Sequence, residues 1–326
     1  MRRLSAWASL ALLLGSTAVL ATPACSSESS APETTTDDNS ELISARISRP
    51  AAERVVAIGD LHGDLEVTRK ALRLAGAIDD RDNWIGGKLV VVQTGDEIDR
   101  EDGDRAIIDL VERLKVDAKR AGGEVIALLG NHELMNTELD YRYVTGGGFA
   151  SFADVAPSQQ WMLQPLSQLS NKKRGRGAAF LPGGPYAKIL ADRPLFMKVG
   201  DNVFVHGGLL PKHVAYGLDK MNDQVQGWCR GTERSVPDIV DADDSPVWLR
   251  LYSESPKPAD CALLDNTLAQ LRAKRLIMGH TVQENGINPT CGERAWRIDT
   301  GLSSYYGGNL EVLEIRGDQL NVLRGE

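Results

Sequence analysis

The stretch VVAIGDLHGD at residues 55–64 decides the fold of this chain. Its first four residues form a β-branched and aliphatic run, which is typical of a buried strand. Gly59 then lets the backbone turn sharply, and two chemically active side chains, Asp60 and His62, follow at once. This order of apolar run, glycine and polar side chains predicts a strand that presents functional groups at its carboxyl end.

Four further segments repeat this order. Apolar runs at residues 89–92, 125–129, 203–205 and 276–278 predict buried strands. They continue as TGDEIDR (94–100), GNHE (130–133), HGG (206–208) and GHT (279–281). Ligands of open α/β sheets bind outside the carboxyl ends of the strands. We therefore expect these loops, although far apart in the sequence, to converge on one site.

Helical patterns separate the predicted strands. One covers residues 65–75 and stops at Gly76, and another covers residues 104–121 and stops at Gly122. The second carries an apolar stripe on one face, which predicts a helix packed on a core. Strands that alternate with helices in this way indicate the α/β class.

The composition is that of an ordinary soluble globular protein. Of the 326 residues, 42% are hydrophobic, 25% charged and 6% aromatic, which excludes wholesale disorder, collagen and a polytopic membrane protein. The formal net charge of −8 opposes non-specific binding to nucleic acid, so no nucleic-acid partner is expected. One basic run, Lys172, Lys173, Arg174 and Arg176, is broken by glycines and is expected to be a loop, either merely solvated or used to dock phosphopeptides.

The amino terminus has the layout of an export signal. Arg2 and Arg3 precede a mostly apolar run at residues 6–21, which is shorter than the roughly 20 apolar residues of a stable membrane span. The Ala24-Cys25 junction, followed by a polar segment, resembles that of a bacterial lipoprotein. We expect a signal peptide over residues 1–24, a flexible linker over 25–50 and one domain over 51–326.

This layout predicts an exported protein on the periplasmic side of a bacterial membrane, attached through a lipid on Cys25. Cleavage without lipidation, which would give a periplasmic or secreted protein, and an uncleaved anchor are the alternatives. An oxidising compartment would permit one disulfide and one buried thiol among Cys229, Cys261 and Cys291. The sequence does not choose the pair.

Histidines are concentrated in the predicted loops, which hold four of the five in the chain. Carboxylate, imidazole and amide side chains together suit Mn, Fe or Zn. There are enough ligands for two divalent ions. One ion would take Asp60 and His62, the other Asn131, His206 and His280, and Asp96 would bridge them.

Two such ions can hold a hydroxide that attacks phosphorus in line and can stabilise the leaving oxygen. His132 is left over once the ligands are counted, and with Asp99 to orient it, its imidazole can act as the general acid. Arg100 adds a planar donor fork that suits phosphate oxygens. The residues therefore favour hydrolysis of a phosphoester.

The ordered series GDLHG (59–63), GDEIDR (95–100), GNHE (130–133) and HGG (206–208) resembles the phosphoprotein phosphatase family of calcineurin-like metallophosphoesterases. Within that family the chain is most similar to the Shewanella-like protein phosphatases. That likeness also rests on FLPGGPY (180–186), VHGGLLP (205–211) and RIDTG (297–301), and it covers roughly residues 55–315.

The resemblance implies a four-layer α/β/β/α sandwich, with a central β-sandwich between helices and a dinuclear metal site at the carboxyl ends of the strands. It implies the same metal, general-acid and phosphate roles as above, with manganese as the first choice of metal. A second phosphate-binding arginine is expected late in the domain, and Arg250 is the candidate. The family follows its arginine with glycine, whereas here Glu101 and Asp102 follow Arg100, and we expect them to reshape this loop and repel anionic substrates.

The leading hypothesis is a metal-dependent phosphatase of phosphorylated proteins or peptides, specific for phosphotyrosine or for phosphoserine and phosphothreonine. The alternatives are a hydrolase of diadenosine tetraphosphate and an inactivated metal-binding scaffold. Val282 occupies the position of a second histidine found in nuclease and phosphodiesterase branches, which argues against those activities.

Overall fold

The computed structural model describes residues 43–325. The expected signal peptide and Cys25 lie outside the described residues. In the part of the chain that is described, no helix combines the length and the apolar character needed to cross a bilayer. Residues 43–50, which the sequence assigns to the linker, belong to the fold because Ile43 and Ile47 are buried in its core.

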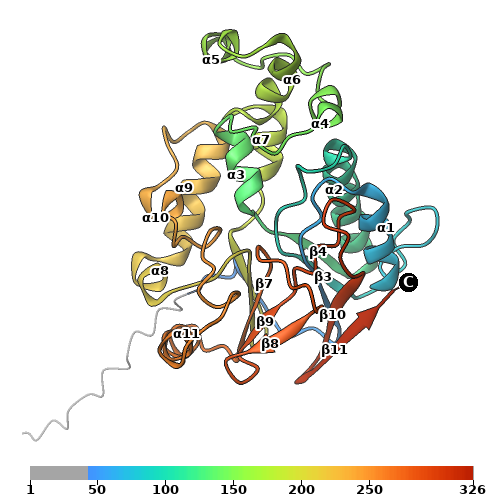
Figure 1. The fold of residues 1–326 in the computed structure, drawn as a ribbon, viewed down its shortest axis with the longest axis vertical. Helices are drawn as coiled ribbons and strands as arrows, with labels where there is room; N and C mark the ends of the chain where they lie inside the picture. Colours follow the sequence, from blue (N-terminus) through green and yellow to red (C-terminus); the bar gives the residue numbers. More distant parts are fainter. Residues whose placement is uncertain (1–42, 326) are drawn as a thin grey trace, which may run out of the picture. The chain divides into compact units, whose positions relative to one another are not determined.

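The described residues form two β-sheets (Figure 1). The first has the strand order β1 (Ser48–Arg49), β5 (Phe196–Val199), β6 (Asn202–Val205), β7 (Arg275–Met278), β9 (Ala295–Arg297) and β8 (Asn288–Thr290). The second has the order β11 (Gln319–Arg324), β10 (Glu311–Arg316), β2 (Val55–Ile58), β3 (Val90–Gln93) and β4 (Glu124–Ala127). Strands β2, β3 and β4 are parallel to one another, as are β6, β7 and β9. Their carboxyl ends therefore leave each sheet on the same side.

Helices connect and cover the strands. Helix α1 (Leu65–Leu74) begins where the Asp64 side chain accepts the Val67 N–H, and α2 (Asp104–Ala121) ends at Gly122, whose φ is 84°. The other helices are α3 (Asn131–Thr137), α4 (Gly146–Ala150), α5 (Leu163–Ser167), α6 (Asn171–Phe180), α7 (Pro185–Leu190), α8 (Pro211–Tyr216), α9 (Leu218–Arg230), α10 (Asp238–Asp241) and α11 (Pro258–Gln270), with a 3₁₀ turn at Gln160–Met162.

Side-chain alternation along the strands builds the layers. Val56 and Ile58 of β2 pack against α1 and α2, whereas Val55 and Ala57 point the other way and contact the first sheet. The outer face of the first sheet packs against α7, α8, α9 and α11. The predicted four-layer α/β/β/α arrangement is confirmed, and the five predicted strands are β2, β3, β4, β6 and β7.

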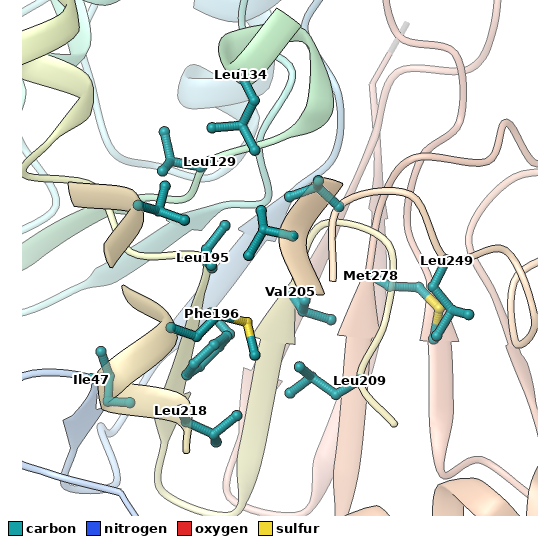
Figure 2. Packing of buried hydrophobic residues seen from close by; sticks show 14 of the residues in the cluster. Ile47, Leu129, Leu134, Leu195, Phe196, Val205, Leu209, Leu218, Leu249 and Met278 are labelled. Carbon is teal, nitrogen blue, oxygen red and sulfur yellow. The ribbon is translucent and has the colours of Figure 1, made fainter. Parts of the chain in front are cut away.

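The largest core cluster anchors the loops that follow the strands. Figure 2 shows part of it, with Leu129, Leu209, Leu249 and Met278 among its labelled residues. Each of these stands next to, or within three residues of, a predicted site residue. Because protein interiors are closely packed and resist compression, this packing limits how far the loops can move.

One disulfide closes a loop of the first sheet. Cys261 in α11 bonds to Cys291 in the turn between β8 and β9, with Cα atoms 5.3 Å apart. Cys229 is a free, buried thiol, and burial raises its pKa to about 12. The structure therefore selects the pair that the sequence left open.

Candidate active site

The loops after β2, β3, β4, β6 and β7 meet at one place. The centre is the Nε2 atom of His206, which lies 2.9 Å from Oδ1 of Asn131, 3.1 Å from Nδ1 of His280 and 3.3 Å from Oδ2 of Asp96. All four residues are buried. Side chains up to 184 residues apart in sequence thus present lone pairs to a common point.

A second group lies on the other side of Asp96. Nε2 of His62 is 3.9 Å from Oδ2 of Asp96 and 3.9 Å from Oδ2 of Asp60, and Nε2 of His132 is 3.8 Å from Oδ2 of Asp96. Two groups of donor atoms are each close enough to hold a metal ion: Asp96 with His206 and His280, and Asp96 with His62 and His132. In the second group Asp60 is the alternative ligand to His132, because Asp60 also lies near Nε2 of His62 and His132 is engaged by Asp99 through Nδ1. Asp96 belongs to both groups.

The protonation of the histidines fits metal binding. Nδ1 of His62 donates to the carbonyl oxygen of Ile98 at 3.2 Å, and Nδ1 of His206 donates to that of Thr94 at 2.9 Å, so that in the neutral ring each Nε2 carries a lone pair and no proton. Metal-bound histidines usually carry such a second hydrogen bond. Burial lowers the pKa of His62 to about 4 and that of His280 well below its usual value. Both are therefore neutral at pH 7, as a metal ligand must be.

Several carboxylates lie close together in the buried site, and nearby positive charge would stabilise their ionised forms. Burial, followed by the nearby charges of Asp299 and Asp96, raises the pKa of Asp60 well above its usual value. Asp299, which sequence analysis did not assign to the site, is itself buried, and burial raises its pKa to about 6. Buried acids of this kind are stabilised when they pair with cations or coordinate metals. The site therefore fits the divalent ions that the sequence predicts.

The backbone of the site is strained. Positive φ angles are uncommon for residues with a side chain, and among those that adopt them are His62 (46°), Asp96 (58°), Asp99 (72°), Arg100 (75°) and His280 (67°). A Cβ atom on Gly279 would lie 2.3 Å from Oδ1 of Asp60, so only glycine fits there. Strain of this kind persists where the surrounding structure fixes it and is common at functional sites.

His132 and Asp99 form the pair expected for a general acid. Nδ1 of His132 lies 2.7 Å from Oδ2 of Asp99, and the side-chain amide of Asn136 donates to both Asp99 oxygens at 3.0 and 3.1 Å. Burial opposes a charged imidazole, but the carboxylates of Asp96 and Asp99 outweigh it and raise the pKa of His132. The carboxylate of Asp99 accepts a hydrogen bond from Nδ1–H, and Nε2 on the other side of the ring lies 3.8 Å from Oδ2 of Asp96.

Glu133 completes the support of the metal ligands. Its Oε2 accepts the backbone N–H groups of Asp96 and Gly130 at 2.9 and 2.8 Å, and its Oε1 accepts that of Glu97 at 2.9 Å. The carboxylate therefore ties the loop after β3 to the loop after β4. Sequence analysis included Glu133 in the GNHE motif without giving it a role.

The basic run at residues 172–176 is not a loop, which corrects the sequence-based expectation. It lies in helix α6, which continues through Gly175 and Gly177. Both glycines pack closely against neighbouring backbone or side chains. Lys172 and Arg174 are exposed, but Arg176 is fully buried and forms an ion pair with Asp99. Sequence analysis could not separate this residue from its exposed neighbours.

The two predicted phosphate-binding arginines lie at the site. The guanidinium carbon of Arg100 is 3.8 Å from the centre of the Tyr143 ring and 4.9 Å from that of Tyr305. Nη1 of Arg250 donates to the carbonyl oxygen of His280 at 3.0 Å and to the Thr281 hydroxyl at 2.9 Å, which places Arg250 beside a predicted ligand.

Asp102 is held by its neighbours. The Thr145 hydroxyl, which caps α4, donates to Oδ1 of Asp102 at 2.5 Å. This contact ties the loop that follows Arg100 to the start of α4. The Asp102 side chain therefore holds this loop through a specific contact with α4.

The chain is similar to known phosphatases in sequence and in fold. Residues 53–284 match the family described as "Calcineurin-like phosphoesterase". The chain is 43% identical over 308 residues to Shewanella-like protein phosphatase 2 of Arabidopsis thaliana, covering 85% of this chain and 78% of that protein. It is 28% identical to Shewanella-like protein phosphatase 1 of Plasmodium berghei, covering 77% and 68%. A solved structure of a cold-active protein tyrosine phosphatase superposes with a TM-score of 0.68 at 24% identity, covering 85% and 77%, and shares the fold.

Proposed function

The chain belongs to the calcineurin-like phosphoesterase family, and we propose that it is a metal-dependent phosphatase of phosphorylated proteins or peptides. The observation that carries this proposal is the His132–Asp99 pair, held 2.7 Å apart, with Nε2 of His132 3.8 Å from Asp96, the residue shared by the candidate metal groups. A site that only binds metal has no use for such a pair. The name of the Arabidopsis relative supports a protein substrate.

We propose two divalent ions, with manganese first and iron or zinc as alternatives. Asp60 and His62 would hold one, Asn131, His206 and His280 the other, and Asp96 both. When bound, such a pair supplies a strong nucleophile from water at neutral pH and stabilises charge on the phosphoryl oxygens. The buried histidines and carboxylates described above support this assignment.

The remaining residues act on the substrate directly. Arg100 and Arg250 would orient the phosphate through charge-assisted hydrogen bonds to its oxygens. A water molecule loses one proton to solvent and its oxygen forms the new bond to phosphorus, while the bond to the leaving oxygen breaks and its electron pair stays on that oxygen. Nε2 of His132 gives its proton to the leaving oxygen, and Asp99 stabilises the imidazole through Nδ1.

The rim of the site favours an aromatic leaving group, so phosphotyrosine is the proposed substrate residue. The ring of Tyr143 lies 5.0 Å from that of His132, and the ring of Tyr306 lies 5.3 Å from that of His62. Tyr305 is 55% exposed beside them. Aromatic rings pack well against one another in offset or edge-to-face arrangements. Such a rim would make fewer packing contacts with the short aliphatic side chain of phosphoserine than with the ring of phosphotyrosine.

Export and lipidation of Cys25 are kept as proposals. A disulfide between Cys261 and Cys291 supports folding in an oxidising compartment, where such bonds form and persist. Mass spectrometry of the native protein would show a processed amino terminus, with or without lipid on Cys25. Detection of an intact Met1 would contradict export with cleavage.

Phosphate release by the purified protein, stripped of metal and refilled with Mn²⁺, tests the proposed function. Peptides containing phosphotyrosine, phosphoserine or phosphothreonine would be compared with diadenosine tetraphosphate. Turnover of the phosphotyrosine peptide is expected. Turnover of the dinucleotide alone would favour a nucleotide hydrolase, and metal binding without any turnover would favour an inactivated scaffold.

A further inference from the structure

Arg176 is the most completely buried cation next to the general-acid pair. Its side chain is 0% exposed although it lies in a helix whose neighbouring basic residues face solvent. Nη2 donates to Oδ1 of Asp99 at 2.9 Å, Nη1 to Oδ2 of Asp104 at 2.5 Å, and Nε to Oδ1 of Asn136 at 2.7 Å. Nη1 also donates to the carbonyl oxygen of Gly148 at 2.9 Å. Every nitrogen of the guanidinium is engaged.

These contacts fix Asp99 on the side away from His132. Oδ1 of Asp99 faces Arg176, and Oδ2 faces the imidazole of His132. Asn136, which accepts from Arg176, donates to both oxygens of Asp99. The carboxylate can therefore neither rotate nor tilt without losing charge-assisted hydrogen bonds, which are the strong ones.

Because Asp104 is a second buried carboxylate beside Asp99, the residue that pairs with both has to be an arginine. Oδ1 of Asp104 accepts the backbone N–H of Asp99 at 2.9 Å, so that two buried carboxylates lie close together. A single guanidinium pairs with both, because its planar fork presents donors in fixed directions. A lysine has a compact ammonium group and cannot reproduce this geometry.

We propose that Arg176 is a positioning residue for the general acid: it holds Asp99 in place, and Asp99 in turn orients the imidazole of His132. This inference rests on the proposed function. It also gives α6 a role in catalysis, although α6 contributes no group that touches the substrate.

The test compares two substrates that differ in their need for a general acid. Tyrosine is a poor leaving group because its oxygen has a pKa of about 10, whereas nitrophenolate leaves readily without a proton. In Arg176→Met, kcat on a phosphotyrosine peptide should fall by about 100-fold, within the range of general-acid contributions, and KM should change little. Loss on p-nitrophenyl phosphate should be several-fold at most.

Four further variants make this result specific. His132→Asn should show the same dependence on the leaving group. Arg174→Met changes an exposed residue of the same helix and should alter neither substrate. Arg176→Lys keeps the buried charge, and the double variant Arg176→Met/Asp104→Asn removes charge from both partners, so these two remain available if Arg176→Met does not fold.

Equal losses on both substrates in a folded Arg176 variant would overturn the proposal, since they would mean that the metal site or the whole fold is damaged. An unchanged kcat on the peptide would overturn it as well. If His132→Asn itself shows no dependence on the leaving group, the proposed role of His132 fails instead. The two failures are therefore distinguishable.

Discussion

The carboxylate of Asp96 belongs to both candidate metal groups, and Oδ1 of the same side chain accepts the backbone N–H of His132 at 2.9 Å. Asp96→Asn keeps the shape of the side chain and removes its charge. We expect the variant to bind at most one Mn²⁺ per chain and to lose activity by at least about 100-fold. Metal analysis of the dialysed protein, together with phosphate release, measures both effects.

Asp117→Asn is the matched control for this prediction, because Asp117 forms only surface ion pairs with Arg113 and Arg120. Exposed pairs of this kind contribute about 0–1 kcal/mol, so neither metal content nor activity should change. Two ions retained in a folded Asp96→Asn protein would refute a bridging role for this carboxylate.

Glu133 gives a second prediction at this scale. Its carboxylate accepts three backbone N–H groups, whereas a glutamine side chain offers a single acceptor oxygen and would turn its NH₂ group toward donors. We expect Glu133→Gln to weaken Mn²⁺ binding by about 10–100-fold, the usual effect of losing an outer partner of a metal ligand. Isothermal titration of the metal-free protein measures this.

Glu138→Gln, at the end of the same helix, is the control and should leave the affinity for Mn²⁺ unchanged. Unaltered Mn²⁺ affinity in Glu133→Gln would show that the loop after β3 is held by other contacts.

Residues that belong to sequence motifs could be assigned to the site from the sequence, whereas most residues that hold them in place could not. Asp60, His62 and Asp96 stand directly after strands, so that their meeting at one edge could be expected from topology alone. Arg176 reaches Asp99 across 77 residues of sequence, and no periodicity or motif records that contact. Asp299 stands in the motif RIDTG, but its place near Asp60 depends on how the two sheets pack, which the motif does not show.

Secondary-structure elements were predictable where their pattern was strong. Helix α2 spans the predicted residues because an apolar stripe and a closing glycine coincide. Helix α6 was not expected, because Gly175 and Gly177 weaken helical propensity. In the structure a Cβ on Gly175 would lie 2.2 Å from the carbonyl oxygen of Phe152, so these glycines permit close packing that brings Arg176 to the site.

The disulfide gives the prediction at the scale of elements. It joins α11 to the turn before β9 and closes a loop with a sequence separation of 30. Cross-linking a loop of this length limits the unfolded chain and contributes about 3–4 kcal/mol. Cys261→Ser should therefore lower the free energy of unfolding by that amount, as measured by urea denaturation.

The comparison for this prediction is Cys229→Ser, which changes a buried free thiol and leaves the disulfide intact. A Cys261→Ser protein as stable as the unchanged one would show that the bond does not form in the native protein. Alkylation of the folded protein should leave Cys229 unmodified, because burial keeps the thiol protonated and inaccessible.

For the molecule as a whole, the match to the calcineurin-like phosphoesterase family confirms the resemblance that the sequence motifs indicate. The likeness to Shewanella-like protein phosphatases extends over most of the chain. The four layers follow from strand alternation and could be expected. The edge position of β1 could not be expected from the sequence. Its residues were assigned to the linker, because only two apolar residues mark that segment.

We propose that two divalent ions, held by buried side chains on both sides of Asp96, make this chain a phosphatase. The most direct measurement is a titration of the metal-free protein with Mn²⁺ that records bound metal and phosphate release from a phosphotyrosine peptide together. We predict two ions per chain, with activity appearing as the second site fills. Saturation at one ion, or two bound ions without phosphate release, would contradict the claim.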